Sequence, residues 1–146
     1  IHAPTHRMTQ PWFFKIYKGK SKNVLCKIIQ KIDKQKYSEV KINKFIEKVK
    51  SSDTIISVCM TKDESNRVPE WEEIAAVSMA VQNMWLSCYV NNIGSYWSTP
   101  ALKDDYAKHS GLNSNQKSLG FFFMGSYKHI ETPKVRDGLD SKVEWV

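Results

Sequence analysis

The sequence predicts a single α+β domain. Its 146 residues are 41% hydrophobic and 25% charged, an ordinary globular composition at a length where one hydrophobic core is the rule. Three short runs rich in aromatic and branched residues have the pattern of strands. Between them lie segments whose apolar residues recur at helical spacing, so we expect helices packed against one sheet.

The first half of the chain predicts a strand, two amphipathic helices and a second strand. Residues 11–18, PWFFKIYK, form the first strand. Apolar residues at one-and-four spacing then predict helices over 22–34 and over about 38–50. Residues 53–60, DTIISVCM, are a short apolar run between polar clusters and predict a buried strand.

A long apolar helix is predicted from Pro69 to about Tyr89. Proline suits the first helical position, and the glutamates that follow suit the positive end of the helix dipole. Beyond them the segment carries few charges on any side, so we expect it to be buried nearly all round. One small domain cannot cover such a helix on every face, and we therefore expect an obligate oligomer.

The rest of the chain predicts a turn, a short helix and two more strands. Residues 91–97, NNIGSYW, are expected to form a turn, followed by a helix over about 99–109. Residues 117–126 predict a strand in which two glycines, Gly120 and Gly125, mark close backbone approaches. The final KVEWV alternates in polarity and predicts a strand that must add to an edge of this chain or another.

The net charge of +7 does not by itself indicate a nucleic-acid partner. Eleven of the 22 basic residues are lysines from Lys15 to Lys48, placed at helical spacing among apolar residues. Such spacing is typical of the solvated face of amphipathic helices, and no stacking aromatics or known binding motif accompany it. We favour the solvated face over a nucleic-acid patch.

Cysteine usage and hydropathy indicate a cytoplasmic protein. The three cysteines are odd in number and far apart, which indicates reduced, buried thiols and not a disulfide frame or a metal site. No apolar run approaches the length of a membrane span, and no charged-then-apolar leader is present. We expect neither a membrane nor a nucleic-acid partner.

The common motifs of nucleotide, metal and nucleophile chemistry are absent. The sequence contains no GxSxG, GxxxxGK, GxGxxG, HExxH or CxxC. His2 and His6 have the spacing of a helical metal pair, but Pro4 between them breaks helical geometry, so we expect no metal site.

Three polar clusters stand out instead. The opening loop bends at Pro4 and carries polar side chains into the first strand, and residues 94–100, GSYWSTP, place hydroxyls where a helix N-terminus would favour an anion or a polar ring. In TPKVR, Lys134 and Arg136 could neutralise a phosphate. Each cluster also has a structural explanation: Trp12 and Trp97 as core, Ser98 and Thr99 as helix caps, and the two cations as a solvated tail.

Three segments in combination resemble the flavin-dependent nitroreductase family, especially its small single-domain bacterial branch. They are APTHRMTQPWFF, VPEWEEIAAVSMAVQNMWLSCYVNNIGSYWSTPAL and KSLGFFFMGS. The resemblance covers residues 3–126 and is weaker in the tail. It implies a homodimer with a central, mostly antiparallel sheet flanked by helices, long helices at the subunit interface, and a C-terminal strand exchanged with the partner. It also implies FMN in two sites between the subunits, reduced by NAD(P)H and reoxidised by a nitroaromatic, quinone or similar small acceptor.

The resemblance implies flavin contacts in two parts of the chain and phosphate ligands in a third. Since the flavin carries out the hydride chemistry, no catalytic acid or nucleophile is implied. The matching positions are His2, His6, Thr9 and Gln10 in the opening loop, Trp97, Ser98 and Thr99 on the other side of the flavin, and Lys134 and Arg136 at the phosphate.

The sequence departs from the family pattern at two places. Met8 stands where many relatives carry a polar side chain toward the ring. The family also begins with a helix carrying an Arg-Arg-Ser type motif that grips the FMN phosphate, and here nothing precedes Ile1. We therefore expect residues 1–146 to be an N-terminally incomplete copy of one nitroreductase-like domain. Two alternatives stay open: a flavin-binding or degenerate scaffold without turnover, and a basic nucleic-acid-binding module.

Overall fold

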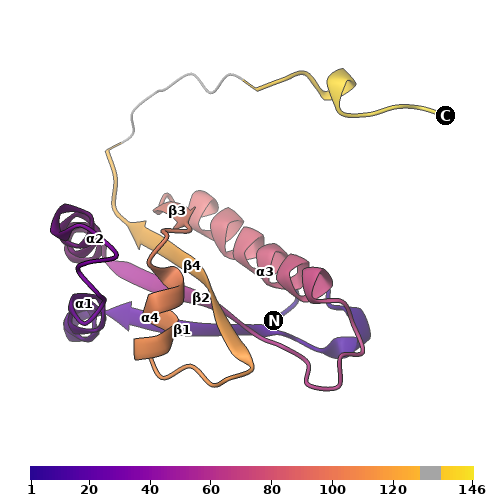
Figure 1. The fold of residues 1–146 in the computed structure, drawn as a ribbon. Coiled ribbons are helices and arrows are strands. Elements are labelled where there is room, and N and C mark those ends of the chain that lie inside the picture. Colours follow the sequence, from indigo (N-terminus) through magenta and orange to yellow (C-terminus); the bar gives the residue numbers. More distant parts are fainter. Residues whose placement is uncertain (129–135) are drawn as a thin grey trace.

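The fold is a four-stranded sheet with helices on both faces (Figure 1). The computed structural model describes residues 1–128 and 136–146. Neighbouring strands are all antiparallel and follow the order β1-β2-β4-β3. The strands are β1 (Trp12–Lys18), β2 (Thr54–Thr61), β3 (Gly94–Ser98) and β4 (Gln116–Gly125). Three of the four strands predicted from the sequence, those over 11–18, 53–60 and 117–126, are thus confirmed to within one residue, and the α+β class with them.

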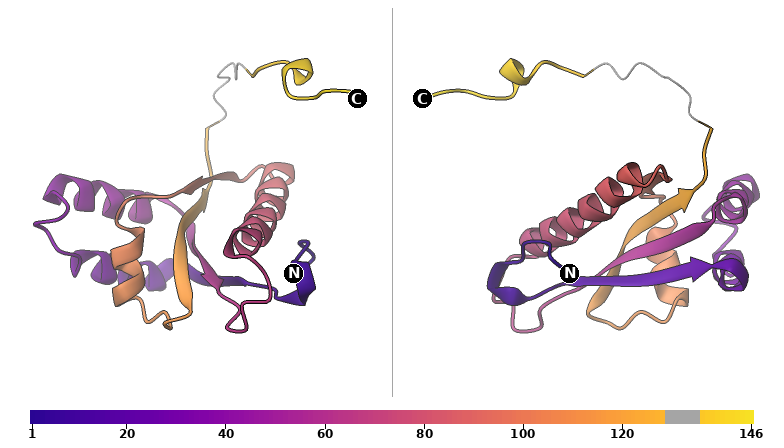
Figure 2. Two further views of the ribbon diagram at one scale, coloured as in Figure 1. Left: turned by 45° about the vertical axis from the view of Figure 1, so that its right-hand side comes forward. Right: turned by 180° about the vertical axis from the view of Figure 1, so that it is seen from behind.

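One long helix covers one face of the sheet, and three shorter helices cover the other (Figure 2). Their bounds are α1 (Lys22–Gln30), α2 (Glu39–Ser51), α3 (Glu70–Val90) and α4 (Lys103–His109). The first helix is four residues shorter at its C-terminus than the 22–34 predicted, because the chain turns after Gln30 toward α2. Ile32 lies in that turn and is buried, so it continues the apolar spacing of the helix although it is not itself helical.

The two cores follow from the alternation of side chains along β4. Phe121 and Phe123 point to the face covered by α1, α2 and α4, where Phe45 of α2 meets both rings edge-on. Phe122 points to the opposite face and packs under α3 with Val77. Successive residues of a strand face opposite sides, so three consecutive phenylalanines join both layers to the sheet.

A buried carboxylate ties α4 to the connection between α1 and α2. Asp105 is 8% exposed and accepts from Lys108, Lys36 and the Tyr37 hydroxyl at 2.7, 2.5 and 2.7 Å. These contacts, that of Lys108 first, hold the pKa of Asp105 well below its usual range. The Tyr37 hydroxyl also lies 3.0 Å from the carbonyl oxygen of Ala101.

The predicted turn over 91–97 is wrong in its second half. Residues 94–98 form β3, which pairs with Phe121–Gly125 of β4 at the edge of the sheet. The turn is confined to Asn91–Ile93, where Asn92 adopts a left-handed φ of 55°. The asparagines and glycine indicate a loop locally, but β4 offers a free edge to which Tyr96 and Trp97 add well.

The single chain does not bury the long helix all round, as expected of a helix that one small domain cannot cover, and burial by a partner stays a prediction. Val77 and Val81 pack against the sheet and are buried. On the outer side, Leu86, Tyr89 and Val90 are 52%, 78% and 77% exposed. One sheet can cover only one side of a helix, so this chain leaves the other side to solvent.

The C-terminal KVEWV forms no strand within the described residues. Residues 142–146 carry no ladder pairing (Figure 1). Trp145 is 94% exposed. Five residues cannot hold a strand conformation without a neighbouring edge. The expected pairing on this chain is therefore absent, and pairing with a partner stays a prediction.

Two further observations bear on the sequence analysis. All three cysteines are buried as free thiols, as predicted. Within residues 1–128 and 136–146, every helix is too short or too polar to cross a bilayer.

Candidate functional site

The opening loop has an unusual backbone. Arg7, Met8 and Gln10 adopt left-handed φ angles of 50°, 54° and 45°, which non-glycine residues visit only at some energetic cost. Hydrogen bonds within the loop hold this shape: the Thr5 hydroxyl lies 3.1 Å from that of Thr9 and accepts from the Gln10 amide at 3.1 Å. Clusters of such backbone conformations are typical of ligand-holding loops.

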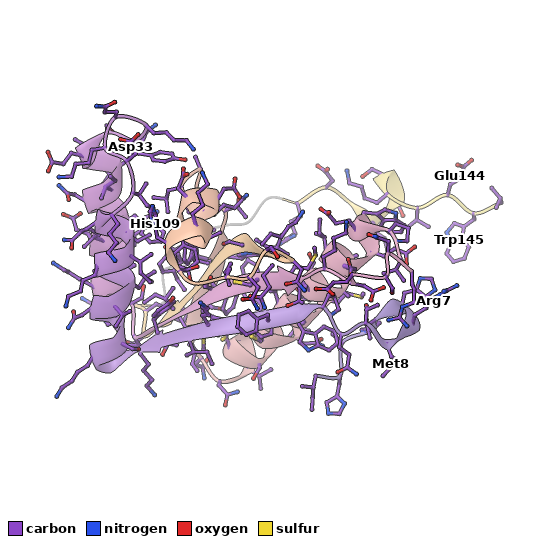
Figure 3. The ribbon with its side chains drawn as sticks, turned by 60° about the horizontal axis from the view of Figure 1, so that its bottom comes forward. Arg7, Met8, Asp33, His109, Glu144 and Trp145 are labelled. Carbon is purple, nitrogen blue, oxygen red and sulfur yellow. The ribbon has the colours of Figure 1, made fainter. Side chains whose placement is uncertain are left out.

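The loop is positioned at one end of the molecule and attached to α3. Arg7 and Met8 project from that end, far from the α1–α2 connection at Asp33 (Figure 3). The Nδ1 atom of His6 lies 2.5 Å from Oε2 of Glu72, in the first turn of α3. A carboxylate accepts hydrogen bonds, so Nδ1 carries the proton and Nε2 faces away from the pair. The ring of His6 is therefore oriented by a charge on α3.

The second predicted cluster lies where β3 ends. Trp97 is held on the α3 side of the sheet, where its indole N–H donates to the Leu119 carbonyl at 3.1 Å. That carbonyl is available because β4 carries an extra residue opposite Val58 and Cys59, a bulge that breaks the ladder at this point. Ser98 is the next residue and lines a hollow beside α2, on the opposite face of the sheet.

Gly120 brings the backbone of β4 against this segment. With φ at +114°, it occupies a conformation that side chains rarely adopt. A Cβ added there would lie 2.4 Å from the Ser98 carbonyl oxygen and 3.1 Å from Cγ2 of Thr99. The predicted close approach at Gly120 is thus confirmed, as is that at Gly125, where an added Cβ would lie 3.2 Å from Asp53.

The two clusters do not meet within one chain. The opening loop leads into β1, and the second cluster, Trp97 to Thr99, lies at the end of β3. These two strands are the opposite edges of the sheet. Three strand spacings separate them, about 14 Å. A ligand that contacted both clusters of one chain would have to span at least this distance across the sheet.

The hydroxyls of GSYWSTP do not sit at a helix N-terminus. Ser98 ends a strand, and α4 begins only at Lys103, after four intervening residues. The predicted anion cradle at a helix start is therefore wrong, because β3 takes up the backbone groups that a helix would have left free.

The remaining predicted positions contribute less to this geometry. His2 is exposed in the opening loop, and Arg136 is exposed in the C-terminal segment. Lys134 lies outside the described residues. The Thr9 hydroxyl already has partners, since it donates to the His6 carbonyl at 3.3 Å.

Two glutamates that the sequence analysis assigned only to the helix start have more specific environments. Glu72 anchors His6, as described above. Glu73 is 1% exposed; its Oε1 accepts from the Asp63 amide at 2.8 Å, whereas Oε2 is buried without a hydrogen-bond partner among the described residues. No local pattern distinguishes them, because both contacts join segments distant in the sequence.

Comparison with known proteins decides the family. A family model described as the Nitroreductase family matches residues 1–126. The chain belongs to the nitroreductase family. The resemblance noted in the sequence is thereby confirmed, and with it the class of enzyme, an oxidoreductase.

Individual nitroreductases agree with the fold and differ widely in sequence. The protein named "Putative NAD(P)H nitroreductase YdjA" of Escherichia coli is 24% identical over 132 residues, covering 86% of this chain and 70% of the relative. A nitroreductase-like family protein from Bacillus cereus superposes with a TM-score of 0.79 at 23% identity, over 99% of this chain and 78% of that one. The FMN-dependent nitroreductase NfnB from Mycobacterium smegmatis, in complex with NADPH, superposes with a TM-score of 0.74 at 13% identity, over 99% and 83%. Identities this low establish the nitroreductase fold and leave the substrate open.

Proposed function

We propose that this nitroreductase is an FMN-dependent NAD(P)H oxidoreductase that works as a homodimer on nitroaromatics, quinones or similar small acceptors. The observation that carries the proposal is the separation of the two clusters at opposite edges of the sheet. Two copies in which the opening loop of one meets the β3 end of the other would complete two equivalent sites.

The outer side of α3 supports a homodimer. Leu86, Tyr89 and Val90 form an exposed apolar stretch at its C-terminal end, continued by Ile93, which is 37% exposed. Contiguous exposed apolar surface of this kind marks protein–protein contacts. A partner's α3 against this side would bury it, and the exposed Trp145 offers a second apolar contact to the partner's sheet edge.

The side chains at the two edges fit a flavin. The side-chain amide of Gln10 and the hydroxyls of Ser98 and Thr99 make no hydrogen bonds to other described residues, so they offer donors and acceptors to the edges of a polar ring. His6 offers its Nε2 in an orientation set by Glu72. The relative NfnB is named as FMN-dependent and was solved with NADPH, which is the pairing that we propose here.

The chain's own residues would act by binding and orientation. When bound, FMN would supply the hydride chemistry, accepting from NAD(P)H and donating to the acceptor in turn. His6 and Gln10 would hold one edge of the ring, and Ser98 and Thr99 of the other subunit would hold the opposite side. Arg136 and Lys134 are the candidates for the phosphate.

Titration of the purified protein with FMN tests the proposal. We expect a flavin absorbance spectrum that stays with the protein through desalting, and its bleaching by NADH or NADPH under anaerobic conditions. Adding a nitroaromatic or quinone should then restore the oxidised spectrum. A protein that binds no flavin would contradict the proposal. Bound flavin that neither NADH nor NADPH bleaches would favour the alternative, a scaffold without turnover.

A further inference from the structure

The positive charge of this protein is concentrated in one part of the fold. Residues 15–50 include twelve lysines and three acidic residues, a net charge of +9 with histidine neutral. The rest of the chain carries ten basic and twelve acidic residues, a net charge of −2. The excess of +7 therefore belongs to the segment that contains α1 and α2, and the remainder of the molecule is slightly acidic.

The fold joins α1 and α2 into one layer. The ammonium group of Lys22 donates to the carbonyl oxygens of Lys50 and Ser52 at 3.0 and 2.6 Å, which ties the start of α1 to the end of α2. Beneath them, Leu25 of α1 and Val49 of α2 are both 0% exposed in the same core cluster. The polar sides of the two helices therefore form a single outer surface.

Most lysines on this surface have no acidic partner. Nine lysines between residues 20 and 50 are exposed, and we call them together the basic surface. Lys34 pairs with Glu39, and Lys36 pairs with Asp105. The other seven form no ion pair within the part of the chain that the structure describes. Their charge is available to an external anion.

The basic surface lies away from α3 and from the opening loop. α1 and α2 cover one face of the sheet, and α3 covers the other (Figure 2). Asp33, in the connection between α1 and α2, lies at the opposite end of the molecule from Arg7 and Met8 (Figure 3). A homodimer formed through α3, as proposed above, would leave both copies of the basic surface exposed.

The side chains of the basic surface fit a lipid membrane better than a nucleic acid. Nucleic-acid interfaces favour arginine and exposed aromatic rings. Residues 20–50 contain no arginine, and their two aromatic residues, Tyr37 and Phe45, are buried. Val24 and Val40 lie among the lysines instead and are 53% and 61% exposed, so they offer apolar contacts to the region below the lipid headgroups.

We propose that the basic surface docks this protein reversibly on membranes rich in anionic phospholipids. Each lysine held near such a membrane strengthens binding about fivefold, so several unpaired lysines act together. The sequence predicted no membrane partner, because helical spacing indicates only that the lysines are solvated. The fold adds that they share one surface with little acidic charge. The proposal goes beyond the proposed function, since docking requires neither bound flavin nor turnover.

Flotation of the purified protein with lipid vesicles tests the docking. The probes are vesicles of phosphatidylcholine alone and vesicles of equal parts phosphatidylcholine and phosphatidylglycerol, with duplex DNA of random sequence as the competing polyanion. The test variant combines Lys20→Gln, Lys27→Gln and Lys31→Gln. These three lysines are exposed and lie outside the hollow beside α2, so the proposed flavin site is left intact.

Two further triple variants serve as controls. Lys62→Gln, Lys128→Gln and Lys142→Gln together lower the net charge by the same amount outside the α1–α2 layer. Arginine at positions 20, 27 and 31 keeps the charge of the basic surface. Urea unfolding of all three triple variants shows whether each folds as the wild type does.

We expect the wild type to bind the mixed vesicles and not those of phosphatidylcholine alone. The glutamine variant of the basic surface should bind about tenfold to a hundredfold more weakly, whereas the charge-matched control and the arginine variant should bind as the wild type does. Binding should also weaken as salt rises from about 0.05 M to about 0.5 M, because screening shortens the reach of the lysines.

Three results would overturn the proposal. The first is equal binding to both kinds of vesicle, and the second is equal loss of binding in the test variant and the charge-matched control. The third is tighter binding of duplex DNA than of the mixed vesicles at the same salt concentration, which would make the basic surface a nucleic-acid site. None of these results bears on flavin binding or reduction, so the proposed function is tested separately.

Discussion

Replacing Gly120 by alanine places a methyl group against the backbone that ends β3. The new Cβ would lie 2.4 Å from the Ser98 carbonyl oxygen, 3.1 Å from Cγ2 of Thr99 and 3.1 Å from the Trp97 indole nitrogen. The first contact is with main chain, which cannot turn aside as a long side chain can. Either the protein bears the clash or residues 97–99 move outward by more than half an ångström.

Two costs add at this position. An alanine at a φ of +114° is in a sparsely populated region, which costs about 1–3 kcal/mol. Overpacking against the Ser98 carbonyl costs about 1–3 kcal/mol more, less whatever the outward movement relieves. We expect the free energy of unfolding to fall by about 2–5 kcal/mol, a large part of the stability of a domain this size.

Gly111→Ala is the matched control. Gly111 also has a positive φ, +69°, but an added Cβ would meet no atom within 4 Å. Its cost is the backbone term alone, about 1–2 kcal/mol. The difference between the two variants therefore reports the contact with residues 97–99 together with the larger backbone cost at Gly120.

Urea unfolding and FMN titration of both variants measure the two possible responses. If residues 97–99 stay in place, the Gly120→Ala protein unfolds at a lower urea concentration than the Gly111→Ala protein. If residues 97–99 move, the affinity of the Gly120→Ala protein for FMN falls instead. The reasoning is refuted if the two variants agree in both measurements, because the close approach at Gly120 would then have no consequence.

Three further predictions concern the opening loop, the outer side of α3 and the buried carboxylate. Glu72→Gln should weaken FMN binding about fivefold by fluorescence titration, since it removes the charge that orients His6, whereas Glu39→Gln should not; equal affinities would contradict that role. Leu86→Glu should shift the protein from dimer to monomer by light scattering, whereas Val24→Glu on α1, an equally exposed apolar position, should not; an intact Leu86→Glu dimer would place the interface elsewhere. The pKa of Asp105 is lower in the folded than in the unfolded protein, so its stabilisation is complete above about pH 4 and is lost as the pH falls through the folded value. Asp105→Asn should therefore lose less stability than the wild type between about pH 5 and pH 2 in urea unfolding, and parallel curves would contradict this.

Local patterns predicted most of the elements. Three of the four predicted strands and all four predicted helices appear in the predicted order, because apolar spacing of two or of three and four residues is a property of neighbouring positions. The same patterns misplaced β3, whose asparagines and glycine indicate a turn. An edge strand forms when a neighbour offers its free edge, and no window around residues 94–98 contains β4.

The candidate site was predicted in its parts and not in its arrangement. The sequence alone indicated His6, Gln10 and the 97–99 segment through the family resemblance, and Gly120 through its place in a strand. It did not indicate Glu72 as the partner of His6, nor the left-handed backbone of Arg7, Met8 and Gln10.

By itself, then, the sequence determined the family and the order of the elements, and it proposed residues for a flavin site. Only the tertiary structure decided that the two proposed clusters lie at opposite edges of one sheet, that α3 keeps an apolar side exposed, and that Lys41, Lys44 and Lys48 line a hollow with an apolar floor. The physical reason is that these features depend on which distant segments become neighbours. The order of the strands in the sheet determines which segments are neighbours, and the spacing of apolar residues along the chain does not specify that order.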